Sequence, residues 1–486
     1  RNENPGIYTG GSYYPIFCAQ NGVNYGYSMT EFWGMRCMMA VVANKLFDNP
    51  FVFYHPETDF NIDSYTIGYY LLGMYTFALT DWLQKETIEN SYDNLCFMAR
   101  DGYLMYHAFQ MLNNVYHSKI NLHYTHLSRK ALLPLMITKE EDFYAMYNNF
   151  TLGTLTPRAF LKIATPIVNQ EKMKRACDTV ERQQIPFNKP FQNIESFMKF
   201  GKLFFTEFFD VDAAAKYREN FKNYMDKQFY GKSATFDVGY SARGESILKE
   251  NFGYNVTAYY VHINNDRPLG RMQKSQTAVK TLYPTTPFIT GFIREQLMSE
   301  LAPSCLEYRE QNGTFGPYFE DVHFNLQTSF VTQTMQDAAL DFVGDMVRIF
   351  GEDLQYLAYR PYDACMPLEY YFTESKELDR TLFRGTLFED DMGMGKNINM
   401  FDLWQRDLQK WGGAANNVIF SHNGGIDYTR YPRFTRICLM FLTDWGTAKR
   451  KCREKLGPNH PHLLNGLVTT YRGVRKCYRV VTGKNR

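Results

Sequence analysis

Short apolar runs, each ending at a charged or glycine-containing turn, recur through the first two thirds of the chain. The runs 95–99, 120–127, 234–238 and 256–263 have the length and composition of buried strands. Between the last two, residues 244–250 have the period of a helix, so this stretch predicts a βαβ unit with parallel strands. The pattern therefore predicts an α/β fold built on a Rossmann-like parallel sheet.

Longer helical patterns surround these runs. The apolar stretch 66–83 is interrupted by Gly68 and Gly73, and it is marginal in length for a membrane span, so we interpret it as a buried helix. Residues 139–230 are helical by pattern. In 327–350 the apolar residues recur on one face of a helix.

These patterns divide the chain into three parts. We expect an N-terminal covering segment (1–62), an α/β catalytic core (63–345) with a helical insertion (139–230), and a mostly helical or irregular C-terminal region (346–486). The C-terminal region ends in a basic tail, 446–486.

Composition adds three constraints. The 36 Tyr and 39 Phe among 486 residues indicate either a Tyr/Phe-rich core or an aromatic-lined carbohydrate or nucleobase site. The nine Cys include no Cys-x-x-Cys pair, which favours a reducing, cytoplasmic compartment. From Lys449 onward there are eleven Lys or Arg and one acid, so the remainder carries 42 basic and 50 acidic side chains. This asymmetry indicates either a solvated face or an anionic partner, such as the inner surface of a membrane.

Charged side chains follow three of the predicted strands. Ligands of open α/β sheets bind at the carboxyl ends of the strands, so these turns are candidates for one site. The candidates are Arg100, Asp101 and Gly102 after the first strand, Ser128, Arg129 and Lys130 after the second, and Asp237, Gly239, Tyr240, Ser241 and Arg243 after the third.

This set of residue types suits a phosphorylated substrate. Arginine and lysine bind phosphate oxygens, and a glycine-rich turn that enters a helix presents backbone N–H groups to them. An aspartate can hold Mg²⁺ together with substrate phosphates, or it can accept a proton from an attacking hydroxyl. A P-loop, a Gly-x-Gly-x-x-Gly turn, a Gly-x-Ser-x-Gly elbow and a His-Glu-x-x-His pair are all absent from the sequence.

Five segments in this order resemble one family. The segments are Ile67-Gly68-Tyr69 with Trp82-Leu83, Phe97 with Arg100-Asp101-Gly102-Tyr103, Ser128-Arg129-Lys130-Ala131-Leu132, Phe236-Asp237 with Gly239-Tyr240-Ser241, and Glu300 with Pro303-Ser304 and Tyr308. Through them the chain resembles, over roughly residues 45–310, the glycan phosphoribosyltransferase domains of bacterial dual-domain ribofuranosyltransferases, which are often described as hydrolases of the haloacid dehalogenase superfamily.

The resemblance implies transfer of a pentose 5-phosphate from phosphoribosyl diphosphate to a glycan in surface polysaccharide biosynthesis. The paired aspartates of the family's phosphatase domain do not occur in this sequence, so a separate phosphatase is one expected partner. A lipid-linked glycan is one option for the acceptor, and the basic tail would then place a cytoplasmic enzyme at the inner membrane surface. Nucleic acid is not an expected partner.

We assign roles within this reading. Asp237 is the expected base and Asp101 the expected metal-binding or donor-orienting group, although the two roles can be exchanged. Arg100, Arg129, Lys130 and Arg243 form the expected phosphate clamp, with Mg²⁺ as the expected cofactor, and Glu300 is a further candidate for substrate binding or for a salt bridge. The alternatives are a glycosyltransferase that uses a nucleotide sugar and a non-catalytic assembly or structural protein on the same scaffold.

Overall fold

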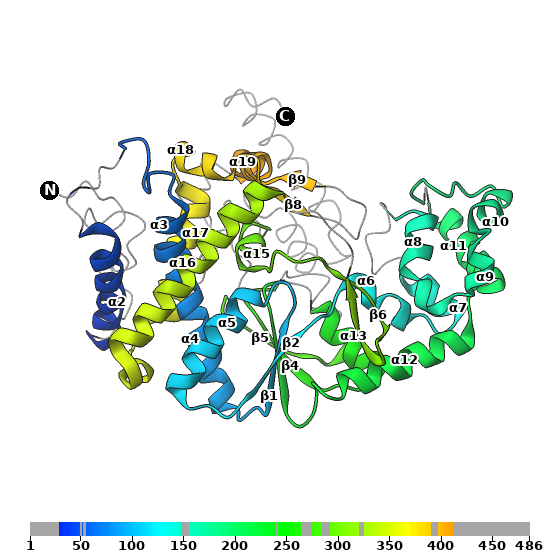
Figure 1. Cartoon of the computed structure of the whole chain (residues 1–486), viewed down its shortest axis with the longest axis horizontal. Helices are drawn as coiled ribbons and strands as arrows, with labels where there is room; N and C mark the ends of the chain where they lie inside the picture. The colour runs from blue at the N-terminus through cyan, green and yellow to red at the C-terminus, as the bar shows by residue number, and fades with distance from the viewer. Residues whose placement is uncertain are drawn as a thin grey trace, which may run out of the picture. The chain divides into compact units, whose positions relative to one another are not determined.

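A parallel five-stranded sheet lies at the centre of the computed structural model (Figure 1). The structure describes residues 29–48, 51, 55–146, 155–191, 193–239, 242–263, 272, 274–283, 292–319, 325–389 and 397–411. The chain divides into two compact units, Arg1–Lys410 and Trp411–Arg486. The second unit, which contains the basic tail, lies outside the described residues except for Trp411.

The strands follow the order β2-β1-β3-β4-β5, and every neighbouring pair is parallel. The α/β fold with a Rossmann-like parallel sheet is therefore confirmed. The first four strands match the predicted runs to within a few residues, whereas the sequence pattern did not reveal β5. The bounds are β1 Asn94–Met98, β2 Asn121–Thr125, β3 Ser233–Asp237, β4 Val256–Tyr260 and β5 Ala278–Thr281.

Successive side chains of β1 point to opposite faces of the sheet, and each face has its own apolar core. Leu95 and Phe97 pack into one apolar cluster, while Cys96 and Met98 pack into another on the opposite face. All five residues of β1 are buried, as expected for a central strand covered on both sides. The sheet is thus a middle layer between two groups of helices.

The first group of helices shares a core with β1, β3 and β4. A continuous helical stretch runs from Ser64 through a π turn, η3 (Gly68–Leu72), to the end of α4 (Gly73–Glu89), and it packs against α16 (Leu326–Phe350). Gly68 allows this approach, because a Cβ there would lie 2.6 Å from the Cα of Met335. The other helices that supply this core are α2 (Met29–Val42), α5 (Tyr103–Tyr116), α15 (Phe292–Met298), α17 (Pro361–Glu374) and α19 (Met400–Trp411).

A buried ion pair joins two of these helices. The guanidinium of Arg294 in α15 donates to the carboxylate of Glu369 in α17 through hydrogen bonds of 2.6 to 3.0 Å. Both side chains are almost fully shielded from solvent, with 0% and 4% exposure. Because α17 also packs on α4, the pair ties α15 into the first helical layer.

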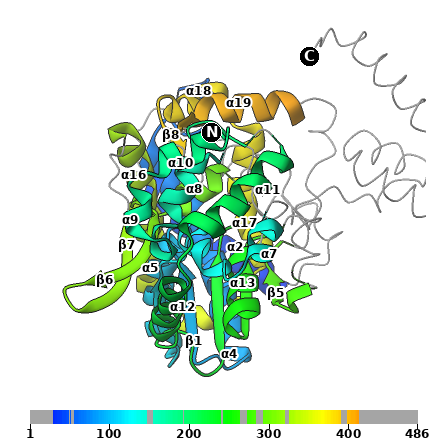
Figure 2. The same cartoon turned by 90° about the vertical axis from the view of Figure 1, so that its right-hand side faces the viewer.

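The second group consists mainly of the helices between β2 and β3, which include the segment 139–230 and lie together in Figures 1 and 2. Its core is rich in phenylalanine; Phe143 and Phe197, for example, stack with their ring centroids 4.5 Å apart. The elements between β2 and β3 are α6 (Arg129–Leu132), η4 (Pro134–Met136), α7 (Glu140–Ala145), α8 (Pro157–Ile163), η7 (Thr165–Ile167), α9 (Gln170–Met173), α10 (Ala176–Arg182), α11 (Ile194–Leu203), η8 (Phe204–Phe208) and α12 (Val211–Met225). Much of the high aromatic content therefore lies in cores.

The remaining elements lie toward the C-terminus of the first unit. The helix α16 runs through residue 345, where the sequence pattern suggested a boundary, and α17 and α19 share the first core. Two hairpins were not predicted: β6 (Cys305–Gln311) with β7 (Thr314–Phe319), and β8 (Leu387–Glu389) with β9 (Asn397–Asn399). No helix in the described part of the chain is long and apolar enough to cross a membrane.

Candidate functional site

The turn after β1 leads directly into α5. Gly102 donates its backbone N–H to the Met98 carbonyl over 2.7 Å, and a Cβ at this position would come within 2.9 Å of the same oxygen. Only glycine therefore fits the close turn. The turn presents Arg100 and Asp101, both partly exposed, at the carboxyl end of the strand. Arg100 also donates from Nη1 to the Ala302 carbonyl over 3.2 Å.

The reversal of strand order lies between β1 and β3. β2 follows β1 in the chain and pairs on one side of it, while β3 pairs on the other side. In open α/β sheets the crevice for a ligand forms at such a reversal. Asp101 follows β1 and Asp237 ends β3, so the two aspartates predicted as catalytic lie at this reversal.

Asp237 lies among other carboxylates. Its Oδ1 accepts a hydrogen bond of 2.9 Å from the backbone N–H of Gly239. Burial raises the pKa of Asp237 well above its ordinary value, and the negative charges of Asp101 and Glu245 raise it further. A carboxylate with a raised pKa is a stronger proton acceptor, which is the property required of a general base.

Glu245 is a site residue that the sequence analysis missed. It lies in the first turn of α13 (Arg243–Phe252) and is only 1% exposed. Its carboxylate accepts from the Thr235 hydroxyl over 3.0 Å and from the Tyr260 hydroxyl over 2.6 Å. Burial raises its pKa, whereas these hydrogen bonds act in the opposite direction. Helical spacing was the available signal, because Glu245 shares a face with the buried Leu248.

The turn after β2 supplies two of the predicted cations. Ser128 caps α6 by accepting from the Ala131 backbone N–H over 3.0 Å, and its hydroxyl donates to the Cys305 carbonyl. Arg129 is exposed, whereas Lys130 is 5% exposed. Ser128 thus anchors the turn to the hairpin β6–β7 instead of pointing freely at a ligand.

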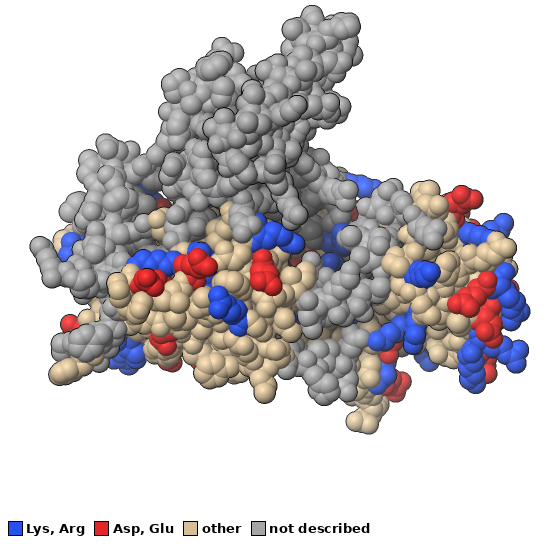
Figure 3. All heavy atoms as spheres, turned by 90° about the horizontal axis from the view of Figure 1, so that it is seen from above, with Lys and Arg blue, Asp and Glu red and all other residues tan. Residues whose placement is uncertain are grey.

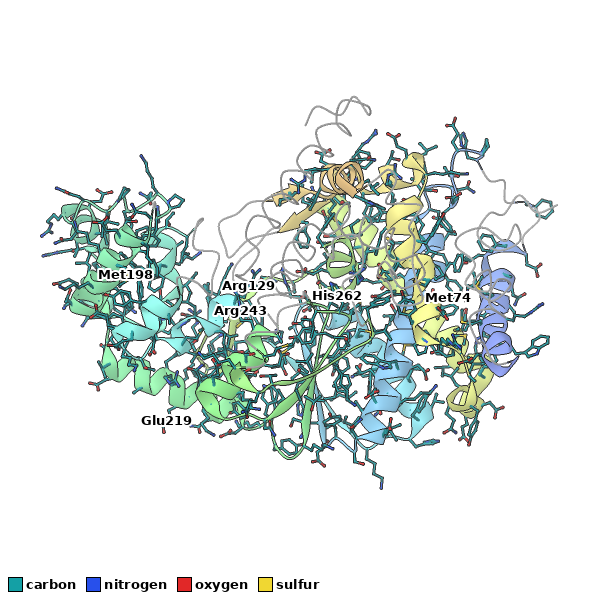
Figure 4. All side chains as sticks on the ribbon, turned by 180° about the vertical axis from the view of Figure 1, so that it is seen from behind. Met74, Arg129, Met198, Glu219, Arg243 and His262 are labelled. Carbon is teal, nitrogen blue, oxygen red and sulfur yellow. The ribbon has the colours of Figure 1, made fainter. Side chains whose placement is uncertain are left out.

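The helices α6 and α13 lie side by side, and each begins with an arginine. A Cβ on Gly244 would lie 3.2 Å from Cδ2 of Leu127, so glycine permits this contact. In the view of Figure 4, Arg129 and Arg243 lie near one another, and His262 lies to one side of both. Figure 3 shows the molecule from above, where Lys and Arg side chains stand among Asp and Glu on the described surface. Tyr240 and Ser241, the other predicted ligands in this turn, lie outside the described residues.

A distant segment covers the turn after β1. The Ser299 hydroxyl, just beyond α15, donates to Oδ1 of Asp101 over 2.7 Å. Glu300 donates its backbone N–H to the Arg100 carbonyl over 3.0 Å, and its carboxylate accepts from the Tyr124 hydroxyl over 2.8 Å. The structure therefore places the predicted residue Glu300 beside the turn that carries Asp101, and it adds Ser299, which was not among the predicted residues.

The same edge carries a buried histidine after β4. His262 is 2% exposed, and burial together with the nearby charge of Arg294 lowers its pKa to about 2. It is therefore a neutral imidazole at physiological pH and does not add a cation to the clamp.

The carboxylates are compatible with Mg²⁺. Within the described ranges, no three His, Cys, Asp or Glu side chains come together as a metal site. Magnesium, however, is commonly held by one or two carboxylates together with substrate phosphates. Asp101 and Asp237 provide two carboxylates, and a cation between them would relieve the repulsion that raises the pKa of Asp237.

Comparison with known proteins does not identify the chain, so its function is inferred from the residues of the site. No family model matches this chain, and curated protein sequences give no significant match.

Proposed function

We propose that the chain is a glycosyltransferase that moves a pentose 5-phosphate from phosphoribosyl diphosphate to a glycan hydroxyl. The observation that carries this proposal is the position of Asp101 and Asp237 at the reversal of strand order, beside turns that supply Arg129 and Arg243. Cations and carboxylates are thus combined where a diphosphate ester would bind. The resemblance to bacterial glycan phosphoribosyltransferase domains supports the same donor.

The proposed step joins the acceptor oxygen to C1 of the pentose. The bond between C1 and the diphosphate oxygen breaks, and its electron pair leaves with the diphosphate. The proton of the acceptor hydroxyl passes to Asp237, whose raised pKa suits it to hold that proton. Arg100, Arg129, Lys130 and Arg243 would stabilise the charge that develops on the leaving group.

Asp101 is the proposed ligand of Mg²⁺, together with the donor's diphosphate. The metal would supply positive charge to the leaving oxygens when it is bound. Ser299 donates to Asp101 Oδ1 and so fixes the orientation of this carboxylate. Gly239 fixes Asp237 in the same way through its backbone N–H.

A nucleotide-sugar donor is the second candidate. Half-buried tyrosines lie next to the site, among them Tyr103 and Tyr124, and such rings can stack on a nucleobase. A cytoplasmic location at the inner membrane surface, a lipid-linked acceptor and a separate phosphatase remain part of the proposal for the first donor. The basic tail on which the membrane contact depends lies outside the described residues.

Thermal unfolding of the full chain tests the donor. A ligand that binds only the folded state stabilises it by about 2.7 kcal/mol at a hundred times its dissociation constant. We expect phosphoribosyl diphosphate with Mg²⁺ to raise the midpoint and a panel of nucleotide sugars to leave it unchanged. Arg129→Ala should weaken the shift, whereas Lys174→Ala, an exposed cation in the helical insertion, should not.

The other outcomes each contradict the proposal. A shift with a nucleotide sugar alone would establish the second candidate. No shift with any donor would favour a non-catalytic protein on this scaffold.

A further inference from the structure

Six aromatic and histidine rings form a continuous patch beside the candidate site. They come from the start of α5, the carboxyl end of β2 and the end of β7. Neighbouring rings are in contact: Tyr103 and His107 have centroids 4.6 Å apart, Tyr106 and Tyr124 5.5 Å, Tyr124 and His126 5.3 Å, and His126 and Phe319 4.9 Å. We call Tyr103, Tyr106, His107, Tyr124, His126 and Phe319 the aromatic patch.

The patch differs from the aromatic cores in its exposure. Each of its six side chains is partly accessible to solvent, whereas the rings of the two cores, such as Phe97 and Phe143, are fully buried. Tyr106 touches Phe97, with ring centroids 5.7 Å apart, so the patch rests on the core beneath it. A rigid, half-exposed aromatic surface of this kind can receive a ligand without rearranging.

A carboxylate lies within the patch. Glu300 accepts from the Tyr124 hydroxyl through Oε2, and among the residues the structure describes, its Oε1 accepts no hydrogen bond. Burial lowers the pKa of His107 and of His126, and the nearby charge of Glu300 only partly offsets this. Both imidazoles are therefore neutral near pH 7, and each offers one donor and one acceptor.

The patch is continuous with the proposed donor site. Glu300 is bonded through its backbone to Arg100, and the preceding residue, Ser299, is bonded to Asp101. The exposed Asp337 of α16 also lies near enough for its charge, like that of Glu300, to raise the pKa of Tyr103. The surface thus begins beside Asp101 and carries two acids.

This chemistry fits an uncharged sugar. The electron-rich faces of aromatic rings attract the C–H groups of a pyranose, and carboxylates and neutral imidazoles bind its hydroxyls. The two acids would repel phosphates, so a diphosphate favours the basic turns at Arg129 and Arg243 instead. A nucleobase could stack here, but it offers few O–H or N–H donors to Glu300.

We propose that the aromatic patch binds the acceptor glycan, with Glu300 orienting the sugar whose hydroxyl is to react. This inference rests on the proposed transferase function, because it places the acceptor next to Asp101 and Asp237. It adds a separate surface for the acceptor and predicts that uncharged sugar units occupy it.

Binding of the full chain to an array of neutral and acidic bacterial-type oligosaccharides tests the patch. We expect retention of neutral glycans by the wild-type chain, and at least about tenfold weaker retention after Tyr103→Ala. Glu300→Gln, which keeps the shape of the side chain, should weaken binding to a similar degree. Tyr356→Ala removes an exposed tyrosine elsewhere and should leave glycan binding unchanged.

The rise in the thermal unfolding midpoint with phosphoribosyl diphosphate and Mg²⁺, the donor shift, distinguishes two failures. It shows whether the acceptor assignment alone is wrong or whether the proposed function is wrong. Tyr103→Ala should retain the shift, which also shows that the variant is folded. A donor shift combined with no neutral-glycan binding, or with binding insensitive to both patch variants, would overturn the acceptor assignment alone. Patch-dependent glycan binding without any donor shift would retain the patch and overturn the proposed donor.

In another outcome, uridine monophosphate binds the wild-type chain but not the patch variants, while neutral glycans neither bind nor displace it. That result would show that the surface stacks a nucleobase, and it would overturn the inference.

Discussion

Charged side chains are gathered in two places in the fold, and their surroundings differ in the two. The guanidinium of Arg294 and the carboxylate of Glu369 are buried as a matched pair with hydrogen bonds between them. Asp237, in contrast, has Asp101 and Glu245 as neighbours, and their negative charges add to its burial in raising its pKa. The first arrangement joins two helices, whereas the second opposes ionisation at a strand end.

The comparison indicates which cluster is adapted to chemistry. The charge of Arg294 is already neutralised by Glu369, so this pair does not require a charged ligand. Carboxylates crowded together favour the binding of a proton or a cation, and such perturbed groups are typical of functional sites.

The largest expected effect is on the proposed base. Asp237→Asn should reduce transfer by about 10²- to 10⁴-fold, because an amide cannot accept the proton. The same variant should raise the free energy of unfolding by about 1 kcal/mol near pH 8, since the amide carries no charge and can still accept from Gly239. Product formation and urea unfolding measure the two effects.

The wild-type rate provides a pH test of the same group. Because a base must be deprotonated to act, kcat/KM should rise as the pH increases through the raised pKa of Asp237. Asp178→Asn, at an exposed acid in α10, is the control and should change neither rate nor stability. An active but destabilised Asp237→Asn chain would contradict the contrast.

Breaking the ion pair between Arg294 and Glu369 should have a nearly equally large effect, but on the free energy of unfolding rather than on the transfer rate. Glu369→Gln leaves the buried guanidinium of Arg294 without its counter-charge, and the expected loss is about 3–5 kcal/mol of unfolding free energy. The double variant Arg294→Met/Glu369→Leu should recover most of that loss. If the double variant were as unstable as the single one, the pair would owe its effect to packing rather than to charge.

Asp363, in the same helix α17, is a third buried charge, and its effect on stability should depend on pH. Burial raises its pKa to about 7, so the folded chain binds more protons than the unfolded chain between about pH 4 and pH 7. Stability should therefore fall as the pH rises through this window. Asp363→Asn should remove the fall and stabilise the chain by up to about 4 kcal/mol near pH 8, with little change near pH 4. Urea unfolding at both pH values measures it, and an equal effect at both would contradict burial as the cause.

The smallest expected effect concerns the orientation of Asp101. Ser299→Ala removes the hydroxyl that donates to its Oδ1, and a hydrogen bond of this kind contributes about 0.5–1.5 kcal/mol, or roughly two- to tenfold in rate. The free energy of unfolding should be nearly unchanged. Steady-state kinetics measure the rate, and Ser299→Thr, which keeps a hydroxyl, should restore part of it.

The sequence could predict the strands and the turns that follow them because these features are local. The apolar run before Arg100 and the glycine turn after Asp237 are each contained within a few residues. The convergence of these turns follows from the parallel order of the strands. The edge strand β5 was missed because it is short and only partly buried, so its composition differs little from that of a loop.

The parts of the site that return from far along the chain could not be predicted in this way. Ser299 lies 198 residues from Asp101, and no local pattern specifies that contact. Tyr124 and Glu300 are 176 residues apart, and only the packing of α15 over the strand ends brings them together. Glu245 could have been selected from helical spacing, but its hydrogen bonds to neighbouring strands depend on the completed sheet.

The helical insertion between β2 and β3 has a consequence for how the protein acquires its fold. The backbone N–H of Lys232 bonds the carboxylate of Asp93 across 139 residues, and β1 pairs with β3 immediately beyond. Closing so long a segment costs chain entropy before any strand pairing compensates for it. The helices of the phenylalanine-rich insertion pack on one another, as α11 does on α7, so we expect the insertion to become compact first and shorten the distance to be closed. The approach of Asp101 to Asp237 would then be among the last features to form, only after the two central strands have met.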